Sequence, residues 1–198
     1  MADEVSNYSV SPAGEKFLMP QKDEYENEFQ RIAQQVTLAR EDQREIVVVM
    51  GLGFVGAVMA AIIADTKDRA GRHSKFVIGC QRPSVRSYWK IPLLNRGESP
   101  VKAEDPEVET LIKRTVLENK TMIATYNSDC LRLADCVVVD IQCDFSKKDL
   151  GNMKTGETDM AAFEATVRTI GQKIQPSCLV LIETTVPPGT TEFVAWPL

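Results

Sequence analysis

Residues 46–64 read IVVVMGLGFVGAVMAAIIA, which is an apolar run, a glycine-rich turn and a second apolar run. Gly51, Gly53 and Gly56 have the G-x-G-x-x-G spacing that dinucleotide-binding turns place between a strand and a helix. The first glycine permits a tight turn, the second lets the backbone approach a pyrophosphate, and the third lets the helix pack closely on the strand. The N-terminus of the helix offers N–H groups and a partial positive charge to the phosphates. This stretch therefore predicts a strand, a turn and a helix that together bind a dinucleotide.

Apolar runs and helical patterns alternate along the rest of the chain. The pattern predicts strands at 45–50, 75–80, 121–125, 136–141 and 177–183, and helices at 54–65, 84–94, 106–118, 128–134 and 160–174. We expect Pro92 to end or kink the second helix, and residues 144–159 to form a polar loop. The continuous apolar runs are typical of buried parallel strands. The predicted fold is α/β, a doubly wound parallel sheet of the Rossmann type with helices on both faces.

An N-terminal extension precedes this pattern. Residues 1–20 are polar and predict a mobile or loosely docked tail. From residue 23 to 43, apolar side chains recur at helical spacing among Glu, Arg and Gln residues, which predicts an amphipathic helix with one buried stripe. The predicted organisation is a tail and helix at 1–44, followed by a dinucleotide-binding domain at 45–198.

The composition of the 198 residues is ordinary for a globular protein, with 43% hydrophobic and 26% charged residues. The formal net charge of −5 provides no basic excess that would favour a nucleic acid or an anionic membrane surface as partner. No apolar run is long enough to span a bilayer, and the N-terminus lacks the layout of a secretion signal. We therefore expect a cytoplasmic protein with neither partner.

The sequence contains five cysteines and a single histidine, His73. The cysteines show no C-x-x-C spacing, and three stand in or beside apolar runs, so we expect buried thiols rather than disulfides or metal ligands. His73 stands in a polar stretch and is expected to lie in a solvated loop. No metal site is predicted.

Three further segments accompany the glycine-rich turn: LNRGESP at 94–100, ADCVVV at 134–139 and LVLIETTVPPGTT at 179–191. Together with that turn, they resemble the N-terminal NAD-binding domain of the UDP-glucose/GDP-mannose dehydrogenase family over roughly residues 45–198. The Thr-Val-Pro-Pro-Gly-Thr run at 185–190 is the most specific part of this resemblance.

The family consists of nucleotide-sugar 6-dehydrogenases. The resemblance therefore implies that the full enzyme oxidises the C6 alcohol of a UDP- or GDP-sugar to a carboxylate in two NAD-dependent steps. It implies a role in polysaccharide biosynthesis, and a homodimer could form in the full enzyme. The catalytic cysteine and the UDP-binding domain of the family belong to later segments, so we expect a cofactor-binding fragment that is inactive alone.

The resemblance also assigns residues to the cofactor site. The pyrophosphate loop that it implies consists of Gly51, Gly53, Phe54, Val55 and Gly56. Thr185 matches a threonine at the end of the fifth strand that lies near the nicotinamide and helps to order the catalytic water, and Thr184 stands beside it. A hydroxyl suits this role because it both donates and accepts hydrogen bonds. The alternative is that the hydroxyls of Thr184 and Thr185 cap a helix or brace a turn.

Two places depart from the family pattern. Gln81, followed by Arg82, stands where the second strand of such a fold usually ends in an acidic residue that binds the adenosine ribose. Without that carboxylate Arg82 could bind a 2′-phosphate and NADP would be accepted; alternatively, Gln81 binds the ribose of NAD and Arg82 faces solvent. Gln142 and Cys143 stand where the family often has a Pro-Thr-Pro turn, and they are predicted to lie near the cofactor.

Two other functions stay open on the sequence alone. The glycine-rich turn also occurs in other Rossmann oxidoreductases, such as hydroxyacid or 6-phosphogluconate-like dehydrogenases. The second alternative is a non-catalytic module, in which the helix at 23–43 docks a partner and the Rossmann fold only senses the cofactor.

Overall fold

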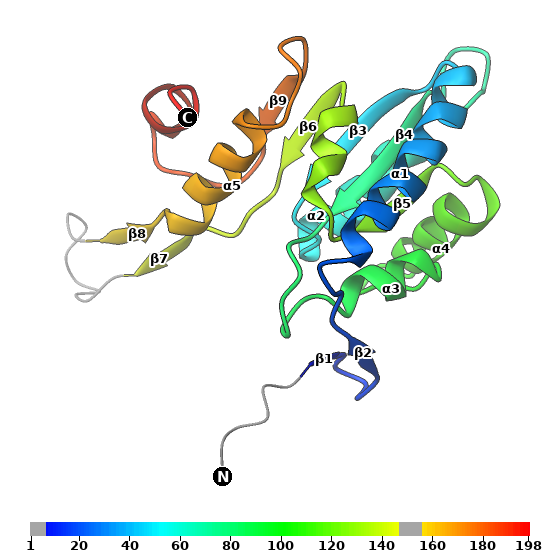
Figure 1. Ribbon diagram of the computed structural model, residues 1–198, viewed down its shortest axis with the longest axis horizontal. Helices are drawn as coiled ribbons and strands as arrows, with labels where there is room; N and C mark the ends of the chain where they lie inside the picture. Colours follow the sequence, from blue (N-terminus) through cyan, green and yellow to red (C-terminus); the bar gives the residue numbers. More distant parts are fainter. Residues whose placement is uncertain (1–6, 147–155) are drawn as a thin grey trace.

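The computed structural model of the protein describes residues 7–146 and 156–198 and centres on a five-stranded sheet (Figure 1). All neighbouring strands of this sheet are parallel, in the order β5-β4-β3-β6-β9. The strands are β3 (Glu45–Met50), β4 (Lys75–Cys80), β5 (Met122–Thr125), β6 (Cys136–Val139) and β9 (Leu179–Ile182). The chain builds outward from β3 to one side and then to the other, so the switch point lies between β3 and β6. The predicted doubly wound sheet is confirmed.

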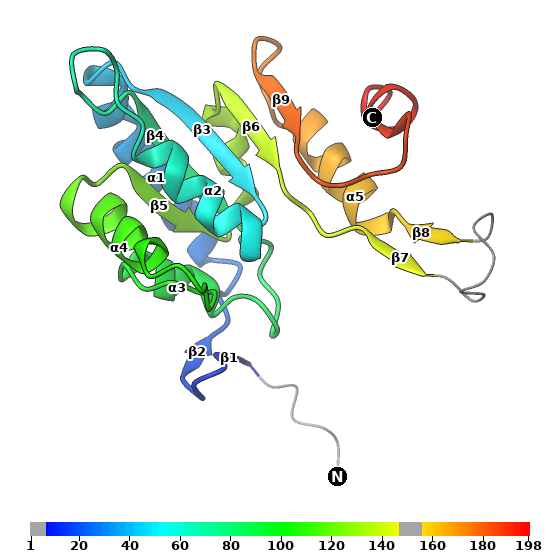
Figure 2. The same ribbon diagram turned by 180° about the vertical axis from the view of Figure 1, so that it is seen from behind.

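Helices cover both faces of the sheet, and each face has its own apolar core (Figures 1 and 2). On one face, Ile46 and Val48 of β3 pack with α1 (Glu24–Glu41), the 3-10 helix η2 (Ser128–Leu133) and α5 (Ala161–Gly171). On the other face, Val47 and Val49 pack with α2 (Phe54–Ala64), α3 (Lys90–Asn95) and α4 (Glu107–Lys113). Because side chains alternate across a strand, one apolar run supplies both cores.

The predicted amphipathic helix is α1, which packs on the sheet of its own chain. Its stripe of Ile32, Val36 and Ala39 is buried in the core shared with β3 and α5. The Thr125 hydroxyl at the end of β5 donates a hydrogen bond to the Glu28 carboxylate at 2.6 Å. The connection from β5 to β6 adds only the six-residue η2 to this face. The N-terminal helix therefore covers sheet surface that this short connection leaves open.

The predicted loose tail is wrong for residues 7–20, which fold into a docked hairpin. Its two antiparallel strands are β1 (Tyr8–Val10) and β2 (Lys16–Leu18). The buried Ser9 hydroxyl donates to the Val85 carbonyl at 2.9 Å and accepts from the Trp89 N–H at 3.1 Å. These bonds satisfy a buried polar group and anchor the hairpin to the segment that follows β4. Residues 1–6 lie outside the described residues.

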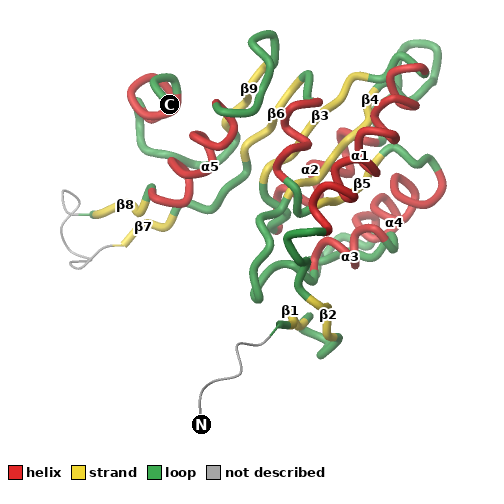
Figure 3. The backbone as a smooth tube through the Cα atoms, in the orientation of Figure 1, coloured by secondary structure: helices red, strands yellow, loops and turns green. Residues whose placement is uncertain are grey.

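Two connecting segments also differ from prediction. The helix expected at 84–94 begins only at Lys90, and Pro92 lies in its first turn without breaking it, because first-turn N–H groups have no partner within a helix. The expected loop at 144–159 contains an antiparallel pair, β7 (Asp144–Ser146) and β8 (Glu157–Asp159), which lies apart from the main sheet (Figure 3). Residues 147–155 of that segment are not described.

The cysteines and the histidine occupy quite different environments. Cys80, Cys130 and Cys136 are buried, Cys143 and Cys178 are half-buried, and all five thiols are free. His73 is half-buried instead of solvated, and its Nδ1 has no hydrogen-bond partner within the described residues. None of the helices in the described ranges is long and apolar enough to cross a membrane.

Candidate functional site

The glycine-rich turn connects β3 to α2 at the edge where the parallel strands end. Gly51 has φ +102°, and a Cβ on it would lie 2.0 Å from the Asp140 carbonyl oxygen. A Cβ on Gly56 would lie 2.0 Å from the Gly51 carbonyl oxygen. Around Gly53, by contrast, a Cβ would meet nothing within 4 Å. Gly51 and Gly56 are thus required for the packing of the turn, whereas Gly53 leaves open space at the start of α2.

The N-terminus of α2 is built to receive an anion. Gly53 is its N-cap residue and makes no side-chain capping bond, and the first turn carries no acidic side chain. N–H groups of a first helical turn have no partner within the helix. They concentrate a partial positive charge beside the open space at Gly53. This arrangement can hold a phosphate or pyrophosphate.

Gln81 supports the turn directly. It follows β4, and its side-chain oxygen accepts a hydrogen bond from the Leu52 N–H at 2.9 Å. The backbone of Gly51 is held as well, because its N–H donates to the Cys80 carbonyl at 2.9 Å. Arg82, the next residue, is exposed. The roles predicted for Gln81 and Arg82 at the adenosine ribose stay predictions.

The two threonines at the end of β9 lie in different environments. The Thr184 hydroxyl donates to the Val139 carbonyl at 3.1 Å and accepts from the Ile141 N–H at 2.8 Å. These contacts are those expected of a hydroxyl that braces a turn, here between the ends of β9 and β6. Thr185 is exposed at the same edge of the sheet. Of the two hydroxyls, that of Thr185 is therefore the better placed to meet a ligand.

Gln142 and Cys143 lie on the segment between β6 and β7. Gln142 is exposed, and its side-chain amide donates to the Asp144 carboxylate at 2.6 Å. Cys143 packs against the core that contains α1 and α5, and burial raises the pKa of its thiol. A raised pKa lowers the thiolate fraction, so this cysteine is a poor nucleophile. Contact of either residue with a cofactor stays a prediction.

Asp140 is a residue of the site that the sequence analysis did not identify. It directly follows β6, and its N–H donates to the Met50 carbonyl at 2.9 Å. Its Oδ2 faces Gly56, where a Cβ would lie only 2.7 Å away. Burial raises the pKa of this carboxyl, and a hydrogen bond from the Gly56 backbone partly offsets the rise. The sequence feature that could have identified Asp140 is a single acidic residue directly after an apolar strand.

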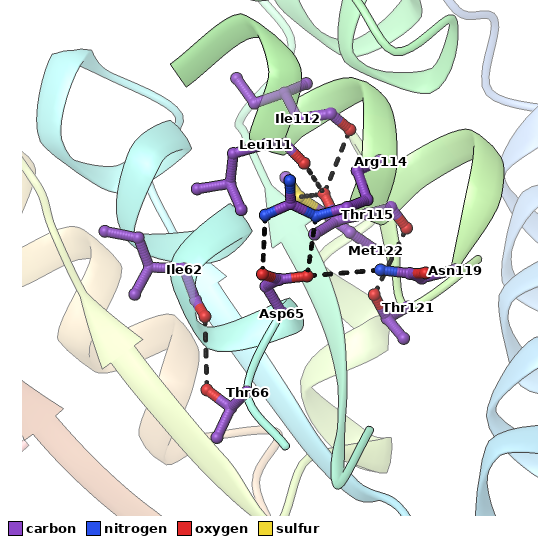
Figure 4. A network of polar contacts seen from close by, with 10 residues as sticks. All are labelled: Ile62, Asp65, Thr66, Leu111, Ile112, Arg114, Thr115, Asn119, Thr121 and Met122. Atoms are coloured by element: carbon purple, nitrogen blue, oxygen red, sulfur yellow. Dashed lines mark hydrogen bonds and ion pairs between the residues drawn. The ribbon is translucent and has the colours of Figure 1, made fainter. Parts of the chain in front are cut away.

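The far end of α2 is fixed by an ion pair (Figure 4). Asp65, the C-cap residue, pairs with Arg114 through two bonds of 2.8 and 3.2 Å. Arg114 begins the π-helix η1 (Arg114–Glu118), which continues α4. The Asn119 side chain adds a bond to Asp65 at 3.3 Å. Hydrogen bonding to Arg114 lowers the pKa of Asp65, so the pair is ionised at neutral pH and holds α2 in place behind the glycine-rich turn.

The described residues contain no group of three or more His, Cys, Asp or Glu side chains that could hold a metal ion. The chemistry of the site rests instead on backbone amides, the Gln81 amide, the Thr185 hydroxyl and the Asp140 carboxyl. These groups lie along the edge formed by the carboxyl ends of β3, β4, β6 and β9, the edge where parallel α/β sheets bind ligands.

Comparison with known sequences gives consistent matches. The sequence profile of the UDP-glucose/GDP-mannose dehydrogenase family, NAD binding domain, matches residues 45–198. UDP-glucose 6-dehydrogenase TuaD of Bacillus subtilis is 24% identical over 148 residues, which is 75% of this chain and 28% of that protein. UDP-N-acetyl-D-mannosamine dehydrogenase of Pyrococcus horikoshii is 26% identical over 149 residues, which is 75% of this chain and 30% of that protein.

Comparison with solved structures agrees. The NDP-N-acetyl-D-galactosaminuronic acid dehydrogenase from Methanosarcina mazei Go1 superposes with a TM-score of 0.66 and 33% identity, over 83% of this chain and 32% of that one. GDP-mannose dehydrogenase from Pseudomonas aeruginosa superposes with a TM-score of 0.61 and 28% identity, over 77% of this chain and 31% of that one. The chain therefore spans between 28% and 32% of the length of these four proteins.

Proposed function

This chain belongs to the UDP-glucose/GDP-mannose dehydrogenase family, as its NAD-binding domain, and we propose from this premise that it is the cofactor-binding part of a nucleotide-sugar 6-dehydrogenase. The proposed reaction oxidises the C6 alcohol of a UDP- or GDP-sugar to the uronate in two NAD-dependent steps. The chain spans less than a third of the length of its relatives. The sugar site and the catalytic cysteine are therefore proposed to lie in further segments of the full enzyme.

The observation that carries this proposal is the geometry of the glycine-rich turn. Gly51 and Gly56 pack the turn tightly, while Gly53 leaves open space in front of the α2 amides. A dinucleotide fits this arrangement because its pyrophosphate needs both close backbone approach and N–H donors. NAD, when bound, accepts a hydride from the carbon that is oxidised.

The residues of this chain would bind the cofactor and orient it. The amides of Phe54 and Val55 at the start of α2 would hold the pyrophosphate, and Gln81 would keep the turn in shape while it contacts the ribose. Thr185 would help to order the catalytic water, because its hydroxyl is exposed just after β9. NAD is the expected cofactor because the NAD-binding domain of the family matches residues 45–198.

Cofactor binding can be tested by titrating the chain with NADH and, separately, with NADPH, following nicotinamide fluorescence. We expect NADH to bind more tightly than NADPH. The variant Gly53→Ala should lower the melting temperature only slightly, because the added Cβ meets no atom of the protein and alanine is merely a poorer N-cap residue than glycine. It should nevertheless lose most of its NADH affinity, because the methyl group fills the space proposed for the pyrophosphate.

Failure of the native chain to bind either cofactor would contradict the proposal. So would a Gly53→Ala variant that binds NADH as tightly as the native chain. A preference for NADPH would leave dinucleotide binding in place but assign the 2′-phosphate to Arg82.

A further inference from the structure

The Asp140 carboxylate lies at the N-terminus of α2, where the proposed cofactor site binds the anionic pyrophosphate. Its Oδ2 lies against Gly56, the third residue of α2, where a Cβ would be 2.7 Å away, and the Gly56 backbone lowers the pKa of this carboxyl. The Gly56 amide belongs to the set of first-turn donors that an anionic ligand would use. The chain thus supplies an anion of its own to the N-terminus of α2.

The position of Asp140 is fixed by the backbone. Met50 and Val139 are paired residues in the β3–β6 ladder. One residue further, the Asp140 N–H bonds to the Met50 carbonyl, and the Asp140 carbonyl lies against Gly51. Backbone contacts on both sides keep the side chain at the switch point between β3 and β6, where the cofactor is proposed to cross the sheet.

The surroundings of Asp140 offer little to neutralise it. The end of β3 and the first turn of α2 carry no ionisable side chain. The segment that follows β6 carries Cys143 and Asp144, and the end of β9 carries Glu183. None of these groups is a cation. Two cations lie at this edge, Arg82 after β4 and Lys102 beside Phe54 and Val55, and in the described residues neither forms an ion pair or hydrogen bond with Asp140. A bound pyrophosphate would therefore meet an uncompensated like charge, which raises the free energy of the ionised carboxylate.

We propose that the Asp140 carboxylate competes with the cofactor pyrophosphate for the α2 amides, so that dinucleotide binding is coupled to protonation of Asp140. This inference rests on the proposed cofactor site. It adds that Asp140 takes up a proton when the dinucleotide binds there. Burial already raises the pKa of Asp140 in the free protein, and a bound pyrophosphate would raise it further. Affinity is then highest at low pH and falls as pH rises between the pKa of the free protein and that of the complex.

The test is calorimetric titration with ADP-ribose between about pH 4 and pH 8, a range that begins near the ordinary carboxyl pKa. This probe has the pyrophosphate and lacks the charged nicotinamide ring. For the native chain we expect affinity to fall across this range and proton uptake to appear as a dependence on buffer ionisation enthalpy. Asp140→Asn keeps the size and the hydrogen-bond acceptor. It should bind about tenfold more tightly than the native chain at pH 8, with a flat pH profile.

The matched control is Asp144→Asn, which removes an exposed carboxylate four residues further along. It should retain the pH dependence of the native chain. A flat native profile, or an Asp140→Asn variant as pH-dependent as the native chain, would overturn the inference and leave the proposed function intact. Absence of ADP-ribose binding by the native chain and both variants at every pH would overturn the proposed function, and the inference with it.

Discussion

The side-chain oxygen of Gln81 accepts a hydrogen bond from the Leu52 N–H at 2.9 Å, so the residue that directly follows β4 also shapes the glycine-rich turn. In the usual pattern an acidic residue at this position binds the ribose. Here the amide oxygen accepts from the Leu52 N–H and the NH₂ group donates to the Arg82 carbonyl at 3.5 Å, so one N–H and one oxygen lone pair remain to face a ligand.

We expect Gln81→Ala to weaken both the fold and cofactor binding. Loss of one hydrogen bond to a backbone amide should lower the free energy of unfolding by about 1 kcal/mol. NADH affinity should fall as well, because Leu52 lies in the turn that presents the α2 amides. Chemical denaturation and NADH titration measure the two effects. The neighbouring variant Arg82→Ala should change neither, and loss of NADPH binding in that variant alone would instead assign Arg82 to the 2′-phosphate.

We expect Gly56→Ala to destabilise the chain through a steric clash. The added Cβ would lie 2.0 Å from the Gly51 carbonyl, and no flexible side chain can yield there. Overpacking of this kind costs about 1–3 kcal/mol, and a backbone contact belongs at the upper end of that range. Thermal unfolding measures the melting temperature of Gly56→Ala and compares it with that of Gly53→Ala. Equal melting temperatures would refute the close approach of Gly56 to the Gly51 carbonyl.

We expect substitutions of Thr184 and of Thr185 to differ in their effect on stability. Thr184→Val removes a hydroxyl that bonds both Val139 and Ile141, leaving a carbonyl and an N–H without that partner. We expect it to lower the free energy of unfolding by about 1–3 kcal/mol. Thr185→Val should be neutral for stability, because Thr185 is exposed. Denaturant unfolding of the pair decides this, and the reverse order of effects would mean that the end of β9 is placed wrongly.

The N-terminal helix should be needed for stability. Ile32, on the buried face of α1, is fully buried, so Ile32→Ala should lower the free energy of unfolding by about 2–5 kcal/mol. Leu38 lies on the same helix and is 56% exposed. Leu38→Ala is therefore the matched control, with an expected change within about 0.5 kcal/mol. Equal effects of the two substitutions on urea unfolding would show that α1 does not dock in solution.

The Asp65–Arg114 pair should make stability depend on pH. Because Arg114 lowers the pKa of Asp65 in the folded chain, the stabilisation exists above the ordinary carboxyl pKa and is lost as pH falls through the lowered value. Arg114→Ala should therefore lower the melting temperature at pH 7, and the difference from the native chain should shrink below pH 4. Arg72→Ala, which removes an exposed partner of Asp68, should have a smaller effect at pH 7. A pH-independent difference for Arg114→Ala would contradict the ion pair.

Much of the fold follows from local sequence. The runs Glu45–Met50 and Lys75–Cys80 form strands with the predicted bounds, because continuous apolar segments flanked by polar residues suit buried parallel strands. The start of α2 at Phe54 follows from the glycine spacing. Pro92 and the segment 7–20 were mispredicted, because a proline is tolerated in a first turn and because the partners of Ser9 lie far along the chain.

The α/β class, the glycine-rich turn and the family of this protein follow from the amino-acid sequence, because each depends on the order and spacing of residues close together in the chain. Tertiary structure alone decided which polar groups meet at the sheet edge. The pairing of Met50 with Val139 brings Asp140 to the turn, and the pairing of Val139 with Ile182 places the Thr184 hydroxyl between two backbone groups. Such contacts depend on the register between strands that are distant in sequence, and a shift of one residue would present each side chain to the opposite face.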